Sequence, residues 1–322
     1  MVSIKDIAKK AGVSISTVSY ALNGSPKVTE ETSAKILAIA KDLNYVPNAA
    51  ARTLKKRKTK IIGAFLADYG GSFFGELLHG MRRTLNKQGY DLIVCTGLES
   101  QRFLPEGIID GAIVLDSNFI DEDLNNYANR GHKIVVLDRE IDHSNIERVL
   151  LDNKLGAEIA VNFLIKKGHE HIIVLTGPSN SYDSIQRLQA VRQVFKQHPS
   201  IHLTIIQGDF DKPSGERAAQ QITENYTEPV AVFSFNDEMA IGMYNFLEDT
   251  DYIIGKHIHI IGFDDVEVSH YTRPRLSTIH YSKEKWGEKA AEQLIHLINK
   301  EKSESQRITV ELLEGDSVKE RK

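Results

Sequence analysis

The sequence predicts an all-α N-terminal helix-turn-helix domain with a hinge helix behind it, followed by an α/β body of two doubly wound parallel-sheet subdomains. Three observations predict this fold class. Short helical patterns fill the first 45 residues, apolar strand-like runs alternate with amphipathic helix patterns from Lys60 onward, and ten such runs suit two sheets better than one. The length of 322 residues also exceeds that of one small domain.

The first 45 residues predict three short helices joined by tight turns. Ser3 is placed as the N-cap of the first helix with Asp6 at capping-box spacing, and Gly12 ends that helix. Ser14 caps the second helix, and the third follows Thr29. Two short helices around a Gly-containing turn, with a third in support, indicate a helix-turn-helix. Apolar residues at helical spacing predict its core: Ile4, Ile7, Ala8, Ala11, Val13, Val18, Ala21, Leu22, Ile36, Leu37, Ala40 and Leu43.

The second of these helices carries no charged residue. In a helix-turn-helix this helix lies in the major groove, with its N-terminal residues facing base edges. Ser16, Thr17, Ser19 and Tyr20 can offer hydroxyls to bases and phosphates, and Ile15 can contact a thymine methyl. The alternative is a plain three-helix bundle whose second helix is simply polar.

The stretch YVPNAAARTLKKRKTK, at 45–60, favours DNA binding over that alternative. Pro47 stops the preceding helix, and Asn48 can cap a new one over AAARTL. A helix this short is marginal alone in water, so we expect it to form only against a partner. The position of KKRK behind it favours contact with phosphates.

Charge is divided unevenly along the chain. Residues 1–60 hold 12 Lys/Arg against 4 Asp/Glu, a net charge of +8, whereas the remainder holds 28 against 40, a net charge of −12. A basic head on an acidic body indicates that only the head meets a polyanion. The sequence shows no run of 18 apolar residues and no signal-peptide pattern, so we expect a cytoplasmic protein with no membrane partner. As the single cysteine, Cys95 excludes disulfides within the chain and multi-cysteine metal sites.

Short buried strands separated by amphipathic helices predict parallel α/β layers in the body. The strand candidates are 61–67, 90–95, 111–116, 133–138, 148–152, 171–176, 203–208, 231–235, 258–263 and 276–281.

Polar and aromatic residues follow most of these strands. Ligands of open α/β sheets bind beyond the carboxyl ends of the strands. Carboxylates, amides, an arginine and aromatic rings at that edge suit a polyhydroxylated ligand such as a sugar. An aspartate after a strand is often a helix N-cap instead, and that alternative stays open for Asp237 and Asp265. The segments concerned are DYGGSFF, DSN at 116–118, DRE at 138–140, GPSNSYDSIQR at 177–187, GDF at 208–210, FND at 235–237 and FDD at 263–265.

Motifs of enzymes and metal sites are missing from the sequence. It contains no GxxxxGK[ST], GxGxxG, GxSxG or HExxH pattern. GHEH at 168–171 and HIHI at 257–260 straddle strand starts, where neighbouring side chains point to opposite faces, so packed or exposed histidines are favoured over a zinc site. We therefore predict no catalytic residues, no metal and no cofactor.

The motifs IKDIAKKAGVSISTVSYALNG, VTEET, LNYVPNAAARTL, FSFNDEMAIG and IIGFDD resemble those of the LacI/GalR family of bacterial transcription regulators. The resemblance covers essentially the whole chain in the same order. It implies that Ile15, Ser16 and Tyr20 face bases, with Ser14, Thr17 and Asn23 nearer the DNA backbone. It also implies a hinge helix that folds on operator DNA, whose Leu54 enters the minor groove with support from Ala51 and Lys55.

The resemblance further implies a periplasmic-binding-protein-like body whose chain crosses between two lobes three times. The expected domains are a headpiece at 1–47, a hinge helix and linker at 48–59, and an effector-binding and dimerisation body at 60–322. Lobe one is expected from about 60–151 and 282–304, and lobe two from about 152–281 and 305–322. Between the lobes, the resemblance implies an effector site of Phe73, Arg187, Phe210, Asn236 and Asp264, with Asp68, Asp138 and Asp152 as secondary candidates.

One segment departs from the family pattern. Only LESQRFLPEGI separates the strands at 90–95 and 111–116, where relatives usually have a longer segment with a full helix. The crossover is therefore at its minimum length.

The combined prediction is a homodimeric repressor that binds a pseudo-palindromic operator and responds to a small effector, a sugar by preference. The alternatives are a catabolite-control-type regulator, which responds to a phosphorylated carrier protein through residues near 283–300, and a nucleobase-responsive repressor.

Overall fold

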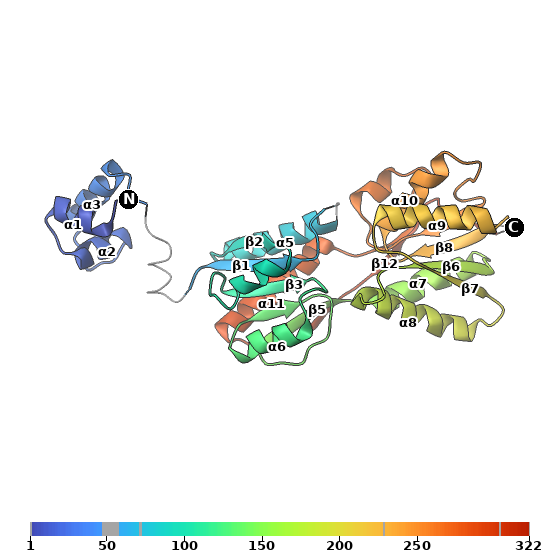
Figure 1. Cartoon of the computed structure of the whole chain (residues 1–322), viewed down its shortest axis with the longest axis horizontal. Coiled ribbons are helices and arrows are strands. Elements are labelled where there is room, and N and C mark those ends of the chain that lie inside the picture. Colours follow the sequence, from blue (N-terminus) through green and yellow to red (C-terminus); the bar gives the residue numbers. More distant parts are fainter. Residues whose placement is uncertain (1, 47–57, 71–72, 228, 303, 322) are drawn as a thin grey trace. The chain divides into compact units, whose positions relative to one another are not determined.

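The computed structural model describes residues 2–46, 58–70, 73–227, 229–302 and 304–321. The chain forms two compact units, Met1–Thr59 and Lys60–Lys322 (Figure 1). Most of the predicted hinge at 48–59, including Ala51, Leu54 and Lys55, lies outside the described residues. The roles expected of these three residues therefore stay predictions.

Within residues 2–46, the first unit forms three helices with the predicted caps. The carboxylate of Asp6 accepts hydrogen bonds from the backbone N–H of Ser3 at 2.8 Å and from its hydroxyl at 2.7 Å. Gly12 ends the first helix with φ of 71°, a conformation that costs glycine little. Thr29 caps the third helix by accepting from the backbone N–H of Thr32. The helices are α1 (Ile4–Ala11), α2 (Ile15–Leu22) and α3 (Glu30–Asp42).

The core of this unit matches the predicted apolar stripes except on α3. Leu37 was expected in the stripe, but its side chain is 49% exposed. Ile36 and Ala40 face inward at i and i+4, with Ile39 and Leu43 partly buried beside them, and this geometry turns Leu37 outward. The buried residues are Ile7, Ala8, Ala11, Val18, Ala21, Ile36 and Ala40.

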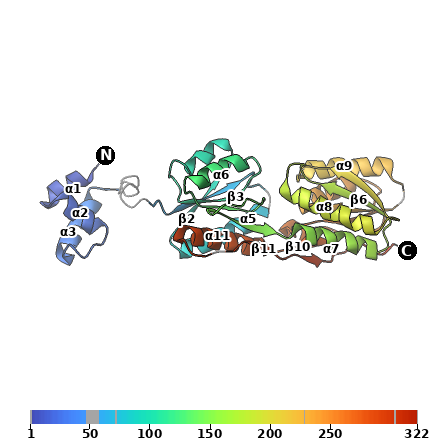
Figure 2. The same ribbon diagram turned by 90° about the horizontal axis from the view of Figure 1, so that it is seen from below.

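The body begins with a six-stranded parallel sheet of order β11-β5-β4-β3-β1-β2. Side chains along its strands alternate between the two faces of the sheet and belong to two hydrophobic cores. Ile113 packs in the core on one face and Val114 in the core on the other. One face is covered by α6 and the other by α5 and α11 (Figure 2). The elements are β1 (Ile61–Leu66), α5 (Phe73–Lys87), β2 (Asp91–Cys95), β3 (Gly111–Leu115), α6 (Asp121–Asn129), β4 (Ile134–Val136), β5 (Ile146–Leu151), α11 (Lys283–Asn299) and β11 (Gln306–Ile308).

A second parallel sheet has the order β7-β6-β8-β9. Helices α7 and α8 cover one face and α9 and α10 the other (Figure 1). Nine of the ten predicted strands of the body therefore lie in these two parallel sheets, and the tenth, predicted at 276–281, forms a strand outside them. The elements of this lobe are α7 (Asn153–Lys166), β6 (His171–Thr176), α8 (Tyr182–Gln197), β7 (His202–Gln207), α9 (Lys212–Asn225), β8 (Val230–Ser234), α10 (Asp237–Glu248), β9 (Ile258–Ile261), the short 3-10 helix η2 (Glu267–Tyr271) and β10 (Thr278–His280).

The end of the chain returns to the first sheet before it joins the second lobe. The strand β11 pairs in parallel with β5, from Gln306 opposite Val149 to Ile308 opposite Leu151. The following strand β12 (Glu311–Leu313) pairs antiparallel with β10. The expectation that 305–322 lies wholly in lobe two is therefore wrong for β11. The chain passes between the lobes after β5, after β10 and between β11 and β12.

The short crossover contains no α-helix. Its residues form a 3-10 helix, η1 (Leu98–Phe103), and turns, while Leu104 and Ile109 are buried in the core beneath. A single 3-10 helix thus replaces the crossover helix on this flank. Among the described helices, none is long and apolar enough to span a membrane.

Candidate DNA-binding and effector sites

The N-terminus of α2 is built by Ser14, whose hydroxyl accepts a hydrogen bond from the backbone N–H of Thr17 at 3.1 Å. The same hydroxyl lies 2.7 Å from the hydroxyl of Ser16 and 2.8 Å from that of Thr17. This cap satisfies one of the free N–H groups at the helix start. It also gathers three hydroxyls at the end of α2 that a major-groove helix presents to DNA.

The other predicted DNA-binding residues lie along α2 and at its end. Ile15 is 46% exposed although it is a large apolar residue. Ser19 and Tyr20 are half-buried, and the Lys27 ammonium lies 5.2 Å from the centroid of the Tyr20 ring. Asn23 follows the helix and donates from its amide to the carbonyl of Ser19 at 2.6 Å.

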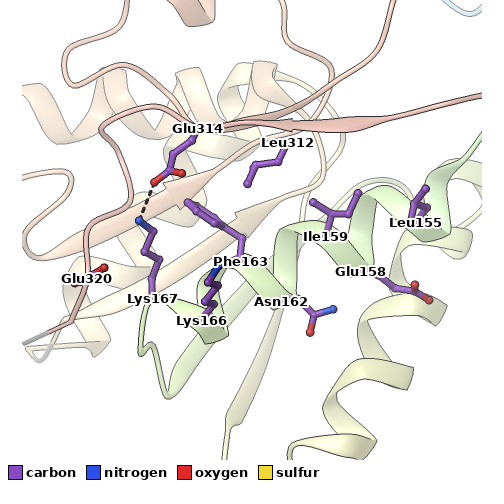
Figure 3. A pocket seen from close by; sticks show the side chains of 10 residues that line it. All are labelled: Leu155, Glu158, Ile159, Asn162, Phe163, Lys166, Lys167, Leu312, Glu314 and Glu320. Carbon is purple, nitrogen blue, oxygen red and sulfur yellow. Dashed lines mark ion pairs between the residues drawn. The ribbon is translucent and has the colours of Figure 1, made fainter.

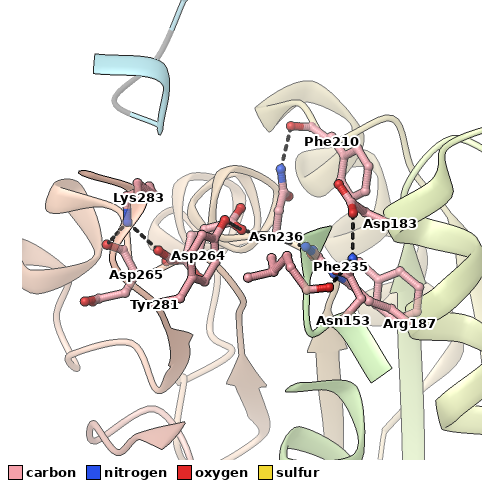
Figure 4. A network of polar contacts seen from close by, with 12 residues as sticks. Asn153, Asp183, Arg187, Phe210, Phe235, Asn236, Asp264, Asp265, Tyr281 and Lys283 are labelled. Carbon is pink, nitrogen blue, oxygen red and sulfur yellow. Dashed lines mark hydrogen bonds and ion pairs between the residues drawn. The ribbon is translucent and has the colours of Figure 1, made fainter. Parts of the chain in front are cut away.

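In the body, Arg187 on α8 is held in a buried polar network. Its Nε donates to Oδ1 of Asn153 at 2.8 Å, and its Nη1 donates to the carbonyl of Phe235. Its Nη2 lies 3.9 Å from Asp264, and the guanidinium stacks over the ring of Phe263 at 3.6 Å. With its side chain only 4% exposed, Arg187 is fixed in one orientation (Figure 4).

Asp264 stands at the end of β9 with φ of 110°, a strained conformation for a residue with a side chain. Its Oδ1 accepts from the hydroxyl of Tyr281 at 2.8 Å. The Lys283 ammonium donates to the backbone carbonyl of Asp264 at 2.6 Å and to that of Asp265 at 3.0 Å. Burial raises the pKa of Asp264 to about 6, while the charge of Arg187 acts in the opposite direction.

Asn236 and Phe210 are joined at the ends of β8 and β7. Asn236 caps α10 by accepting from the backbone N–H of Met239 at 3.0 Å, and it donates to the carbonyl of Phe210 at 2.8 Å. The structure thus brings Arg187 and Asp264 together, and Asn236 together with Phe210, at the carboxyl ends of one sheet.

Phe73 lies on the first lobe, at the start of α5. Its ring makes edge-on contacts with Phe74 at 5.0 Å and with Trp286 at 6.4 Å between centroids. Both phenylalanines are half-buried, and Phe73 packs against the core of the body.

The three secondary aspartates each have a local structural role. Asp68 is exposed and accepts from the backbone N–H groups of Tyr69 and Gly70, which closes its own turn. Asp152 caps α7 by accepting from Leu155 at 3.4 Å. Asp138 forms two hydrogen bonds with Arg139, at 2.8 and 2.9 Å.

Comparisons with known proteins agree with this architecture. Residues 3–48 match the model described as "Bacterial regulatory proteins, lacI family", and residues 161–318 match that of a periplasmic binding protein-like domain. The chain is 34% identical over 330 residues to the probable HTH-type transcriptional repressor ExuR of Bacillus subtilis, covering 99% of each chain.

The chain belongs to the lacI family.

Two solved structures of LacI-family regulators are similar to this chain over most of its length. A sugar-binding transcriptional regulator from Enterococcus faecalis is 48% identical, with a TM-score of 0.78 over 82% of this chain and 99% of that one. A LacI-family regulator from Enterococcus faecium with bound ribose is 25% identical, with a TM-score of 0.75 over 81% of this chain and 100% of that one.

Two aspartates of this LacI-family chain do not cap helices as the sequence allowed. Asp237 is fully buried and accepts from the hydroxyl of Thr278 at 2.7 Å and from the backbone N–H of Val266 at 3.0 Å, because Asn236 takes the cap position. Burial and the charge of Asp264 raise the pKa of Asp237 well above its ordinary range. Asp265 lies between two histidines instead, 2.9 Å from His270 and 2.7 Å from His280.

Sequence reasoning missed four residues of the network: Asn153, Asp183, Tyr281 and Lys283. Asn153 and Asp183 form a hydrogen bond at 2.6 Å across 30 positions of sequence. Asn153 lies two residues after the end of β5, so an argument from strand ends could have included it. No sequence pattern marks Lys283, because a lysine in the first turn of a helix is usually exposed, whereas this one is buried.

The histidine motifs are packed against protein groups. The rings of His169 and His259 lie 4.3 Å apart, and both contact backbone atoms of Lys319. His171 contacts the hydroxyl of Thr204 at 3.1 Å. Within the part of the chain that the structure describes, no group of three His, Cys, Asp or Glu side chains could hold a metal ion.

A hollow of about 500 Å³ lies along α7 (Figure 3). Leu155, Ile159, Phe163 and Leu312 form its apolar part. At its rim Lys167 pairs with Glu314 at 2.7 Å, and Glu158, Lys166 and Glu320 also line it. None of the residues expected to bind the effector lines this hollow, so we assign the candidate effector site to the network of Arg187 and Asp264.

Proposed function

We propose that this LacI-family regulator is a homodimeric repressor that binds a pseudo-palindromic operator and responds to a sugar bound between the two lobes of the body. Two heads match an operator of two-fold symmetry, one for each half-site. In this proposal Ser14, Ile15, Ser16, Thr17, Ser19, Tyr20 and Asn23 contact DNA, together with Ala51, Leu54 and Lys55 of the hinge.

The observation that carries the sugar proposal is the polar network of Arg187. The network joins one guanidinium, two carboxylates and two amides at the strand ends, next to the ring of Phe210. These groups belong to Arg187, Asp264, Asp183, Asn153 and Asn236. Paired donors and acceptors of this kind bind adjacent hydroxyls, and an aromatic ring covers the C–H face of a sugar. The ribose bound to the E. faecium relative supports the same class of ligand.

The alternatives lack comparable support. On α11, where a phosphorylated carrier protein would contact the chain, Lys283 is buried and Lys289 pairs with Glu292 at 2.8 Å, while Lys285 is exposed. A phosphoserine site is built from several basic groups that meet at the phosphate, and a single exposed lysine does not supply one. For a nucleobase, we find no contact among the described residues that favours it over a sugar.

In this mechanism the effector changes the relative orientation of the lobes. It can shift that equilibrium only by its difference in affinity for the two states. The network lies where the chain passes from β5 into α7, since Asn153 is the first residue of α7. A ligand bound in this network would contact both the effector site and a segment of the chain that passes from one lobe to the other.

The test is thermal stabilisation of the full-length protein by a panel of sugars, sugar phosphates, nucleobases and amino acids. A ligand at about 100 times its Kd adds roughly 2.7 kcal/mol to stability. Stabilisation by a neutral sugar should be lost in Arg187→Gln and in Asp264→Asn, and kept in Arg192→Gln, which changes an exposed arginine of the same helix.

Operator binding supplies the second arm of the test. DNA selected from a random palindromic library should bind two copies of the chain, as measured by sedimentation, and the sugar that stabilises the protein should change this affinity. A panel without any sugar response, or a complex with one copy per operator, would contradict the proposal.

A further inference from the structure

Asp183, the second residue of α8, is joined to Arg187 through a single amide. The amide nitrogen of Asn153 donates to Oδ1 of Asp183 at 2.6 Å, and the amide oxygen of Asn153 accepts from Nε of Arg187 at 2.8 Å. Figure 4 shows the three side chains next to one another. Because both ends of the amide are used, the position of the Asp183 carboxylate is tied to that of the guanidinium.

Asp183 lies near the boundary between the lobes. The preceding residue, Tyr182, donates from its hydroxyl to Glu140 of the first lobe at 3.0 Å. Burial raises the pKa of Asp138, at the end of β4 in the first lobe, and the charge of Asp183 raises it further. Asp183 keeps part of its surface exposed. Burial raises the pKa of its carboxyl, while the charge of Arg187 and the hydrogen bond from Asn153 act in the opposite direction.

Four basic side chains lie around this position, and each contacts protein groups. Arg307 is paired with Glu140 at 3.3 Å, and the other three are more deeply buried. Arg187 donates to Asn153 and to a backbone carbonyl and lies beside Asp264. Arg139 donates to Asp138, to Asp121 and to the carbonyls of Asp116 and Phe119.

The third basic group, Lys283, is 1% exposed and donates to two backbone carbonyls. Each of these three cations lies within 4 Å of a carboxylate other than Asp183: Arg187 lies beside Asp264, Arg139 beside Asp138 and Asp121, and Lys283 beside Glu76. Their charges are therefore balanced within the protein before a ligand is placed beside Asp183.

From this arrangement we propose that Asp183 is a specificity-determining residue, which accepts hydrogen bonds from effector hydroxyls and excludes sugar acids and sugar phosphates. The inference rests on the proposed function, because it presupposes a sugar effector. A carboxylate or phosphate of a ligand would stand beside Asp183 and Asp138 in a poorly hydrated site, where like charges repel strongly. A hydroxyl, in contrast, donates a charge-assisted hydrogen bond to the same oxygen.

The experiment compares neutral sugars with their charged counterparts on the full-length protein by calorimetry. The pairs are ribose with ribose 5-phosphate, glucose with glucuronate and glucose 6-phosphate, and galactose with galacturonate. The neutral member that binds should exceed its anionic counterpart by about tenfold or more in affinity. In Asp183→Asn this ratio should fall by about tenfold, since the shape is kept and the charge is removed.

Two further variants make the result specific. Asp183→Ser removes the carboxylate with a smaller side chain and should lower the ratio in the same direction. Asp251→Asn removes an exposed carboxylate of the same lobe and should leave the ratio unchanged. Thermal unfolding of each variant confirms that it is folded before its affinity is compared.

The outcomes separate this inference from the proposed function. If the wild-type protein binds an anionic sugar as tightly as the neutral one, or if both Asp183 variants keep the wild-type ratio, the specificity role is wrong and the sugar-responsive regulator stands. If no sugar of either charge binds, the proposed function fails and the inference fails with it.

Discussion

The ring of Phe210 lies directly on Gly177. A Cβ added at Gly177 would stand 2.2 Å from Cζ of that ring, 2.4 Å from Cε1 and 2.5 Å from Cε2. Phe210 itself has φ of 64°, a conformation that residues with side chains seldom adopt, and its carbonyl accepts from Asn236. The position of this ring therefore depends on the absence of a side chain at Gly177.

Gly177→Ala should displace the ring and weaken sugar binding. Inserting a methyl group into a filled site costs about 1–3 kcal/mol of stability, which thermal unfolding measures. Adding Phe210→Ala to this variant should restore part of the stability, because the clash is removed, without restoring the affinity. Wild-type affinity in Gly177→Ala would show that Phe210 takes no part in the effector site.

A second close contact joins helices α5 and α11 in the first lobe. A Cβ at Gly80 of α5 would stand 2.0 Å from the backbone oxygen of Glu284 on α11, so the two helices touch backbone to backbone. Gly80→Ala should lower the free energy of unfolding by at least about 1–3 kcal/mol, since neither backbone can move away cheaply. Gly75→Ala is the matched control on the same helix, where no heavy atom lies within 4 Å. Equal stability of the two variants would contradict the packing.

The sequence was sufficient for elements whose signal is local. Ten strands of the body were predicted because runs such as 111–116 are continuously apolar and bounded by turn residues. The three-residue strand β11 was assigned to the wrong lobe, because three residues carry almost no pattern and its partner β5 lies more than 150 positions earlier.

The candidate site was only partly predictable for a similar reason. Strand-end position indicated the segments at 235–237 and 263–265, and the family resemblance selected Asn236 and Asp264 within them. The link of Asp183 to Asn153, in contrast, exists only after the chain has crossed between the lobes. Asp237 and Asp265 could not be separated by sequence from true helix caps, since buried partners such as Thr278 belong to a later strand. Local pattern identifies the sheet edge, and long-range pairing decides which side chains meet there.

Asp264 should make stability depend on pH. Its pKa of about 6 in the folded protein exceeds the ordinary value of 3.8, so the folded state favours the protonated form. The contribution is fully present below pH 3.8 and is lost as pH rises through about 6, a difference of roughly 3 kcal/mol. Asp264→Asn should remove this slope, and an effector hydroxyl that donates to the ionised carboxyl should bind more tightly above pH 6 than below it. Parallel curves of unfolding free energy against pH for both proteins would refute the assignment.

The pair of His169 and His259 should act in the opposite direction. Burial lowers the pKa of His259 to about 4 from 6.5, and its Nδ1 accepts from the backbone N–H of Lys319 at 3.1 Å. Its contribution to stability is therefore complete above pH 6.5 and is lost as pH falls through about 4. His259→Asn keeps a hydrogen-bond acceptor but has no group that titrates. In urea unfolding experiments, the free energy of unfolding of this variant should therefore fall less between pH 6.5 and pH 4 than that of the wild type. An equal fall in both proteins would show that His259 does not cause the loss of stability in acid.

Ile15 and Leu37 form a matched pair for testing the DNA-binding face. They are 46% and 49% exposed, so truncating either should change the stability of the head little, but only Ile15 lies on α2. We expect Ile15→Ala to weaken binding to a selected operator by about 1 kcal/mol, the low end of what one base pair contributes, and Leu37→Ala to leave it unchanged.

The slope of affinity against salt concentration should stay the same in both variants, because no phosphate contact is removed. Fluorescence anisotropy with operator and with random DNA measures both quantities. If Leu37→Ala weakened operator binding as much as Ile15→Ala, α2 would not be the helix that contacts the bases.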